Sequence, residues 1–240
     1  MGWTGTGSPW SHGVVGEIDE QEREEGMRIA QVSQFFEEVC NESESPDVRG
    51  VEFLTRSLIR FGHEVTVFAS GDSRVSGTLV PVSPLALRHY PAPKRHLSEG
   101  LTFLALEQAF SMGTSFDLIH VHAGFAAFPL MRRSPLPTLA TVYGPLDAPE
   151  ILCVFREFRE LALVATSVEQ IRQCPDLNWL ALIPVPATCQ PSEVHVDTLD
   201  SLVETATAYT AVYEGIVKRA SNRTQTVPPV YSLQGAHTVL

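Results

Sequence analysis

The sequence predicts an α/β fold, with a Rossmann-like parallel sheet that carries helices on both faces of a single domain. From Met27 onward, short strand-like runs alternate with helical patterns, which is typical of βαβ units. The run at 117–121 is apolar with little alternation, as in a strand buried on both faces. With 44% hydrophobic residues in 240, the chain can bury a sizeable core.

The first half of the domain begins with RIAQVS at 28–33, where apolar and polar residues alternate as in a strand. Apolar residues recur at helical spacing over 51–61, and Gly62 follows as a C-terminal cap. Two further strands are expected at 65–69 and 78–82, and both are followed by turn or proline signals. These elements predict a strand, a crossover helix and two more strands.

The second half opens with a proline-rich loop over 84–96, followed by a helical apolar pattern over 97–112. After it, further apolar runs predict strands at 117–121, 137–142, 162–166 and 179–183. The segments between and after these strands predict helices at 125–132, 150–158, 168–173 and 197–219. In such a sheet, ligands bind at the carboxyl ends of the strands.

Four segments make up the predicted organisation. Residues 1–26 are expected to be a disordered acidic tail, because six acidic residues and one basic residue lie between Glu17 and Glu25. The domain is expected over 27–186, and Met27 could be the natural start. Residues 187–220 are expected to be a linker and a C-terminal helix that packs back on the domain, and residues 221–240 a loose tail.

The formal net charge of −11 disfavours nucleic acid as a partner, because phosphate binding needs an excess of basic residues. The sequence has neither a run of eighteen apolar residues nor a basic start followed by an apolar stretch. We therefore expect no membrane span, no secretory signal and a cytoplasmic location. The four cysteines are far apart without a CxxC pair, so they indicate free thiols rather than a zinc site or disulfides.

Two expected strands end in residues that could face a ligand. His120 and His122 share one side of a strand end. We expect one to be buried and hydrogen-bonded and His122 to face the cleft, with burial of both as the alternative. No third ligand is nearby, so no metal is expected. Tyr143 could stack on a sugar or simply pack at a turn, and Gly144 permits close approach or a positive φ.

The segment that follows the first strand is acidic and contains no paired glycines. A phosphate-binding loop needs free backbone NH groups near a helix start. Before the helix that follows Ser45 and Pro46, only one glycine, Gly50, and one basic residue, Arg49, remain as features of an anion-binding site. The alternative is an ordinary helix start that is capped by Ser45 or Asp47.

Seven segments in order resemble the N-terminal domain of GT-B glycosyltransferases of the glycogen-synthase-like family four. They are MRIAQVSQFFE, LTRSLIRFGHEVTVFASGDS, FDLIHVH, PTLATVYG, FREF, ALVATS and DLNW, and the resemblance covers roughly residues 27–186. The resemblance implies retaining transfer of a sugar from a nucleotide sugar to a carbohydrate acceptor, with no separate cofactor. The C-terminal helix at 197–219 resembles the last helices of such enzymes, which cross back to the first domain.

The chain departs from the family pattern at four places. The family's nucleotide-binding domain, with its Glu-x7-Glu motif, is replaced by the short segment from Pro184 to Val196. The family's entry to that domain, Gly-Val/Leu-Pro, reads Pro-Val-Pro at 184–186. The glycine stretch before the first helix falls on 45–48, so Ser45, Pro46, Arg49 and Gly50 are expected to be a remnant of the donor-phosphate loop. The family's His-Gly after the fifth strand is Tyr143-Gly144.

These departures leave the catalytic residues unassigned and two functions open. The first is a glycosyltransferase whose donor half comes from a separate chain or a homodimer partner, with an acceptor cleft around His122, Tyr143 and Gly144. Arg49, Lys94 and Arg95 are then the nearest basic candidates for the leaving diphosphate. The second is a non-catalytic carbohydrate- or protein-binding module. A flavodoxin-like domain is disfavoured, because no phosphate loop follows the first strand.

Overall fold

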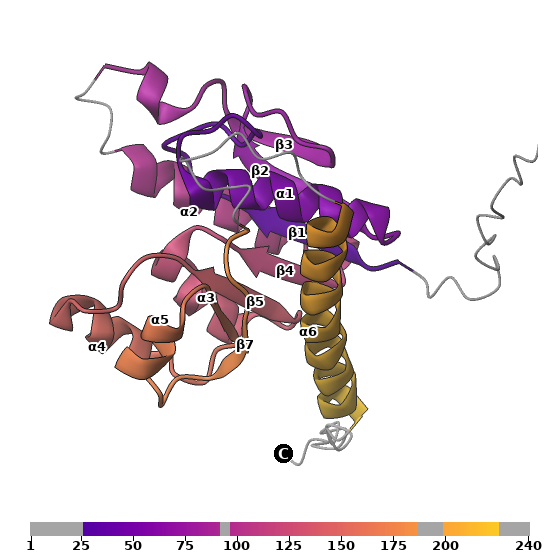
Figure 1. Ribbon diagram of the computed structural model, residues 1–240, viewed down its shortest axis with the longest axis vertical. Coiled ribbons are helices and arrows are strands. Elements are labelled where there is room, and N and C mark those ends of the chain that lie inside the picture. The colour runs from indigo at the N-terminus through magenta and orange to yellow at the C-terminus, as the bar shows by residue number, and fades with distance from the viewer. Residues whose placement is uncertain (1–25, 92–96, 187–198, 226–240) are drawn as a thin grey trace, which may run out of the picture.

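The computed structural model describes residues 26–91, 97–186 and 199–225. Seven strands form one parallel sheet in the order β3-β2-β1-β4-β5-β6-β7 (Figure 1). The strands are β1 (Arg28–Val32), β2 (Glu64–Ser70), β3 (Thr78–Ser83), β4 (Leu118–Val121), β5 (Thr138–Val142), β6 (Leu163–Ala165) and β7 (Trp179–Leu182). The predicted Rossmann-like α/β fold is confirmed.

Helices connect the strands and cover the sheet. The α-helices are α1 (Pro46–Arg60), α2 (Leu97–Ser111), α3 (Phe128–Arg133), α4 (Pro149–Glu157), α5 (Val168–Gln173) and α6 (Leu199–Gln225). Three short 3-10 turns are η2 (Leu87–His89), η4 (Gly113–Ser115) and η5 (Gly124–Ala127). Within the described residues, no helix is both long and apolar enough to cross a membrane.

Each face of the sheet has its own core. On one face, Ile29, Leu118 and Leu139 pack with buried residues of α1 and with Tyr209 and Tyr213 of α6. On the other face, the apolar residues of the strands pack with α2, α3 and α4. Figure 1 shows α6, in gold, lying beside α1 and across the ends of the central strands. Helix α6 thus packs on the first face of the domain through Tyr209 and Tyr213.

Helix α1 begins at Pro46, five residues before the predicted start at 51. Ser45 is the N-cap residue, as in the alternative of an ordinary helix start, although its side chain makes no capping hydrogen bond. Pro46 supplies the fixed φ of a first helical position. Val48 is buried and extends the apolar stripe backward. Gly62 has a φ of +87°, which confirms the C-terminal cap predicted there.

Helix α6 continues to Gln225, so the first five residues of the predicted loose tail at 221–240 are helical. A helix without a glycine or proline stop can extend past its last apolar contact while its backbone bonds continue. The acidic tail at 1–25, the linker at 187–198 and the remainder of the C-terminal tail lie outside the described residues.

Candidate functional site: the carboxyl ends of β1, β4 and β5

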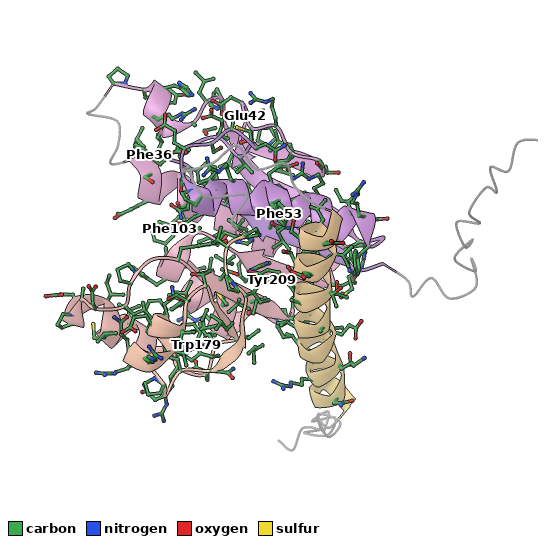
Figure 2. All side chains as sticks on the ribbon, in the orientation of Figure 1. Phe36, Glu42, Phe53, Phe103, Trp179 and Tyr209 are labelled. Carbon is green, nitrogen blue, oxygen red and sulfur yellow. The ribbon has the colours of Figure 1, made fainter. Side chains whose placement is uncertain are left out.

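His120 in β4 anchors helix α6 to the sheet. Its Nδ1 atom lies 2.8 Å from the Tyr213 hydroxyl, and its Nε2 atom lies 2.8 Å from the Thr141 hydroxyl. The Thr141 hydroxyl also lies 3.1 Å from the hydroxyl of Tyr209, which projects from the sheet-facing side of α6 (Figure 2). Burial, and to a lesser extent the neighbouring His122, lower the pKa of His120 well below its usual value. His120 is thus the buried, hydrogen-bonded histidine of the predicted pair, and it is unsuited to bind a ligand.

His122 follows β4 and is only 1% exposed, so it does not face an open cleft as predicted. Helices α1 and α6 cover this face of the sheet. The sequence pattern shows on which side of the strand His122 lies, but not what packs against that side. Its Nδ1 atom lies 2.8 Å from the Tyr143 hydroxyl, and burial lowers the pKa of His122 to about 3. The ring is therefore neutral at physiological pH and can act only as a hydrogen-bonding group.

Buried polar atoms without a hydrogen-bonding partner gather around His122. They are Nε2 of His122, the Oγ atom of Ser33 and both amide atoms of Gln31. Gln31 pairs in register with His120, and the His122 NH donates to the carbonyl of Val32, so strand alternation places Gln31, Ser33 and His122 on one face. Buried polar groups normally have partners, so this face can accept hydroxyl groups or water molecules. Gln31 and Ser33 were missed by the sequence reasoning, which considered the ends of the other strands and the loops after them.

The Tyr143-Gly144 turn is held by Gln170 of α5. The Gln170 amide donates to the carbonyls of Val142 and Gly144 at 3.0 and 2.7 Å, and its Oε1 accepts from the NH groups of Thr166 and Ser167 at 2.8 and 3.1 Å. Gly144 has a φ of +73°, as its predicted role allows. Sequence reasoning missed Gln170, although Ser-x-x-Gln at 167–170 is a capping-box signature that indicates a fixed helix start.

Tyr143 and Gly50 come together at a small cavity. They line it with Thr166, Tyr209 and residues of the segment after β7. Its volume is about 20 Å³, which is enough for one water molecule. The structure thus brings Gly50 to Tyr143, while Ser45, Pro46 and Arg49 do not line this cavity.

The predicted donor-phosphate remnant at the start of α1 is filled by the protein itself. The Glu37 carboxylate accepts from the NH of Ser45 at 2.9 Å, and the Arg49 guanidinium donates to the carbonyl of Ser43 at 2.7 Å. Pro46 has no NH to offer. A carboxylate from the preceding loop is therefore already bound to the NH of Ser45, next to the helix start where a phosphate would bind.

The sequence profile of Glycosyltransferase Family 4 matches residues 48–169, which is half of the chain. The chain belongs to glycosyltransferase family 4. The matched residues run from the first turn of α1 into α5 and include His122, Tyr143 and Gly144. The family match does not extend to the loop that holds Glu37, to Gln170 or to α6.

Among solved structures, the chain resembles a sucrose-phosphate synthase from Thermosynechococcus elongatus, with 17% identity and a TM-score of 0.49. That alignment covers 78% of this chain and 98% of the other. A search of curated proteins gave no match.

Proposed function

We propose that this chain is the acceptor-side half of a GT-B glycosyltransferase and that it does not transfer sugar alone. In the complete reaction, a sugar passes with retention from a nucleotide sugar to a carbohydrate acceptor. A separate donor-domain chain, or a second copy of this chain, would supply the missing contacts to the nucleotide. The cytoplasmic location expected from the sequence is part of this proposal.

The observation that carries the proposal is the docking of α6. Only twelve residues, 187–198, separate the described segment after β7 from the start of α6. A nucleotide-binding domain needs far more chain than this. Tyr209 and Tyr213 nevertheless return to the first domain and bond to its buried polar residues, as a crossing-back helix would. The resemblance to the family's last helices supports the same conclusion.

The start of α1 supports the absence of donor chemistry. Stabilising a departing nucleotide diphosphate requires NH groups or cations that point at it. Glu37 instead places a negative charge at the NH of Ser45, and Arg49 is bonded to the backbone of its own loop. A phosphate at this position would have to displace a carboxylate.

The acceptor side is supported by His122 and Tyr143. Their hydrogen bond aligns the two side chains, and the unpartnered Nε2 atom of His122 lies among the polar atoms of Gln31 and Ser33. Such a set can bind the hydroxyl groups of a carbohydrate after local opening of the cover provided by α1 and α6. The burial of His122 also favours the second candidate, a non-catalytic carbohydrate- or protein-binding module.

The experiment measures turnover and glycan binding by the purified full chain. We expect no sugar transfer from a panel of nucleotide sugars and saturable binding of a glycan that is weakened by Tyr143→Phe. Tyr90→Phe is the matched control, because it removes a tyrosine hydroxyl outside this site.

Turnover by the chain alone that is lost in His122→Ala would refute the half-enzyme proposal and make His122 a working residue. Glycan binding without turnover, even after a donor-domain chain is added, would favour the binding module. Absence of glycan binding would refute the acceptor role.

A further inference from the structure

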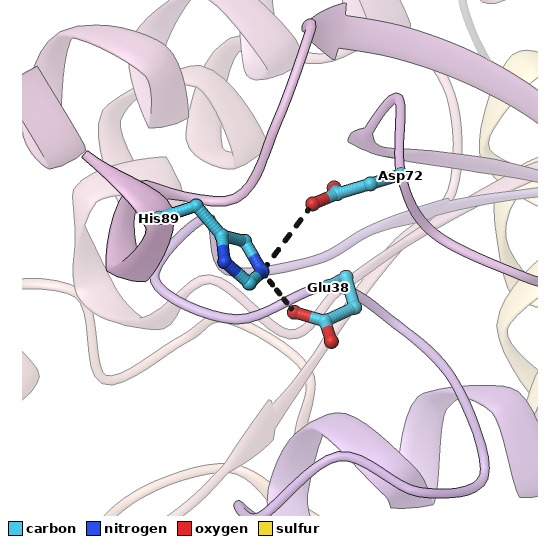
Figure 3. A group of neighbouring side chains, drawn as sticks. All are labelled: Glu38, Asp72 and His89. Atoms are coloured by element: carbon cyan, nitrogen blue, oxygen red, sulfur yellow. Dashed lines mark ion pairs between the residues drawn. The ribbon is translucent and has the colours of Figure 1, made fainter.

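Three side chains from three different loops meet at the carboxyl edge of the sheet, on the side of β1, β2 and β3. Glu38 follows β1, Asp72 follows β2 and His89 ends η2 after β3. Figure 3 shows the His89 ring pointing between the two carboxylates. Its Nε2 atom lies 3.4 Å from Oε2 of Glu38 and 3.7 Å from Oδ2 of Asp72.

These distances suit a shared metal ion. Ligands that bind zinc at about 2.0–2.2 Å in a tetrahedral arrangement lie about 3.3–3.6 Å from one another. One ligand atom from each of the three residues lies within 4.8 Å of the others. Small side-chain movements would therefore bring all three onto one ion.

The Glu38 carboxylate is held with one oxygen facing the group. Glu38 is 9% exposed, and the Arg88 guanidinium donates to its Oε1 atom. Its Oε2 atom is buried and has no hydrogen-bonding partner, although it faces His89. A buried carboxylate oxygen without a partner is costly, and a cation beside it would remove that cost.

Asp72 is oriented in a similar way, because both of its oxygens accept from the NH of Ala86 at 3.0 and 3.1 Å. Hydrogen bonds from Arg88 and Ala86 thus fix the two carboxylates, as residues that hydrogen-bond to the ligands do at metal sites. The two carboxylates are thus held in place before any ion arrives.

The local charge also suits a divalent cation. Three carboxylates, those of Glu38, Glu44 and Asp72, lie around the guanidinium of Arg88 and the His89 ring. Apart from His89, these four charged groups sum to −2. The Nε2 atom of His89 also lies 3.4 Å from Nε of Arg88, a hydrogen bond that His89 gives up when Nε2 binds a metal ion.

We propose that Glu38, Asp72 and His89 bind a divalent transition-metal ion such as Zn²⁺ or Mn²⁺. One imidazole nitrogen and two carboxylate oxygens suit these ions better than Mg²⁺, which prefers oxygen ligands alone. The ion would tie together the loops after β1, β2 and β3. Three protein ligands leave a further position for water or an oxyanion. The proposal departs from the sequence expectation of no metal, which weighed the pair His120 and His122 and the cysteines but not this group.

The rival explanation for the position of His89 between Glu38 and Asp72 is a protonated histidine. A protonated His89 would bridge the same two carboxylates without any metal ion. The two explanations differ in what stabilises the chain, because a metal ion acts as a ligand whose effect rises with its concentration.

The test uses the full chain stripped of metal, titrated with Zn²⁺, Mn²⁺, Co²⁺ and Mg²⁺ by calorimetry and thermal unfolding at neutral pH. We expect one ion of Zn²⁺ or Mn²⁺ to bind this group and to raise Tm, and Co²⁺ to give a visible absorption band, whereas Mg²⁺ has little effect. His89→Gln and Asp72→Asn should each weaken metal binding at least about tenfold. Even the mutation of residues that only hydrogen-bond to the metal ligands typically lowers metal affinity by that factor.

Glu44→Gln is the matched control, because it removes one carboxylate beside Arg88 without removing a ligand. It should leave the affinity within a few-fold of that of the unchanged chain. Asp72→Asn retains an acceptor for the NH of Ala86, and His89 is partly exposed, so both variants should fold, which circular dichroism checks.

Three results would overturn the proposal. The first is no binding by the unchanged chain, with a Tm that responds to pH alone, which would assign the group to a protonated His89. The second is binding that His89→Gln and Asp72→Asn leave intact, which would place the ion elsewhere on the chain. The third is an equal loss in Glu44→Gln, which would reduce the effect to general charge.

Discussion

Removing the hydroxyl of Tyr213 tests how α6 is joined to the domain. Tyr213 is completely buried, and its hydroxyl lies 2.8 Å from Nδ1 of His120. In Tyr213→Phe the ring still fills its space, but Nδ1 of His120 is left without a partner. An unsatisfied buried polar group costs about 1–3 kcal/mol, so we expect the free energy of unfolding to fall by about 2 kcal/mol.

Tyr209→Phe is the matched comparison on the same helix. The Tyr209 hydroxyl lies 3.1 Å from the Thr141 hydroxyl, which keeps its bond to Nε2 of His120 after the change. No buried group loses its last partner, so the expected loss is about 0.5–1.5 kcal/mol. Tyr213→Ala also leaves a cavity and should cost about 3–5 kcal/mol.

Urea unfolding followed by circular dichroism measures the three variants, and Tm should fall by about 2–4 °C per kcal/mol for a chain of this size. The expected order of loss is Tyr213→Ala, then Tyr213→Phe, then Tyr209→Phe. If Tyr213→Phe is as stable as the unchanged chain, the bond to His120 does not hold α6 and the reasoning fails.

Three further predictions concern the residues around this site. Burial lowers the pKa of His122 to about 3, whereas an unfolded histidine titrates near 6.5, so only the unfolded state takes up a proton between these values. As the pH is lowered below about 6.5, the free energy of unfolding should therefore fall by about 1.4 kcal/mol per pH unit because of this residue. In His122→Gln, the midpoint of urea unfolding should depend less steeply on pH. Gly144→Ala should lower the free energy of unfolding by about 1–2 kcal/mol because Gly144 has a positive φ, whereas Gly215→Ala within α6 should raise it by about 0.5–1 kcal/mol. Neither added Cβ meets an atom within 4 Å, so the two variants differ in backbone conformation and not in steric contact. Equal changes in Tm would contradict this argument. Gln170→Glu turns a carboxylate toward two carbonyl oxygens, so the free energy of unfolding should fall by about 3 kcal/mol or more. Chemical denaturation compares this variant with Gln170→Met. A smaller loss of stability in Gln170→Glu than in Gln170→Met would show that these hydrogen bonds do not hold the turn.

The sequence alone determined the fold class and most of the elements. Apolar period and glycine caps depend on neighbouring residues, so the strand at 28–33 and the cap at Gly62 could be predicted within one or two residues. The order of the quoted segments also led to the glycosyltransferase family. The apolar repeat placed the start of α1 too late, whereas Ser45, one of the two caps expected from the sequence, is the N-cap residue.

Only the tertiary structure decided what surrounds each candidate residue. A repeat of two shows that His120 and His122 share a face, but their burial comes from α1 and α6, which lie far away in the sequence. Glu37 fills the helix start at Ser45 through a loop that has no regular pattern. Glu38, Asp72 and His89 span fifty-two residues and meet only because parallel strands end at one edge of the sheet. Hydrogen bonds and charge pairs of this kind depend on distance in space, and a one-dimensional pattern does not carry that information.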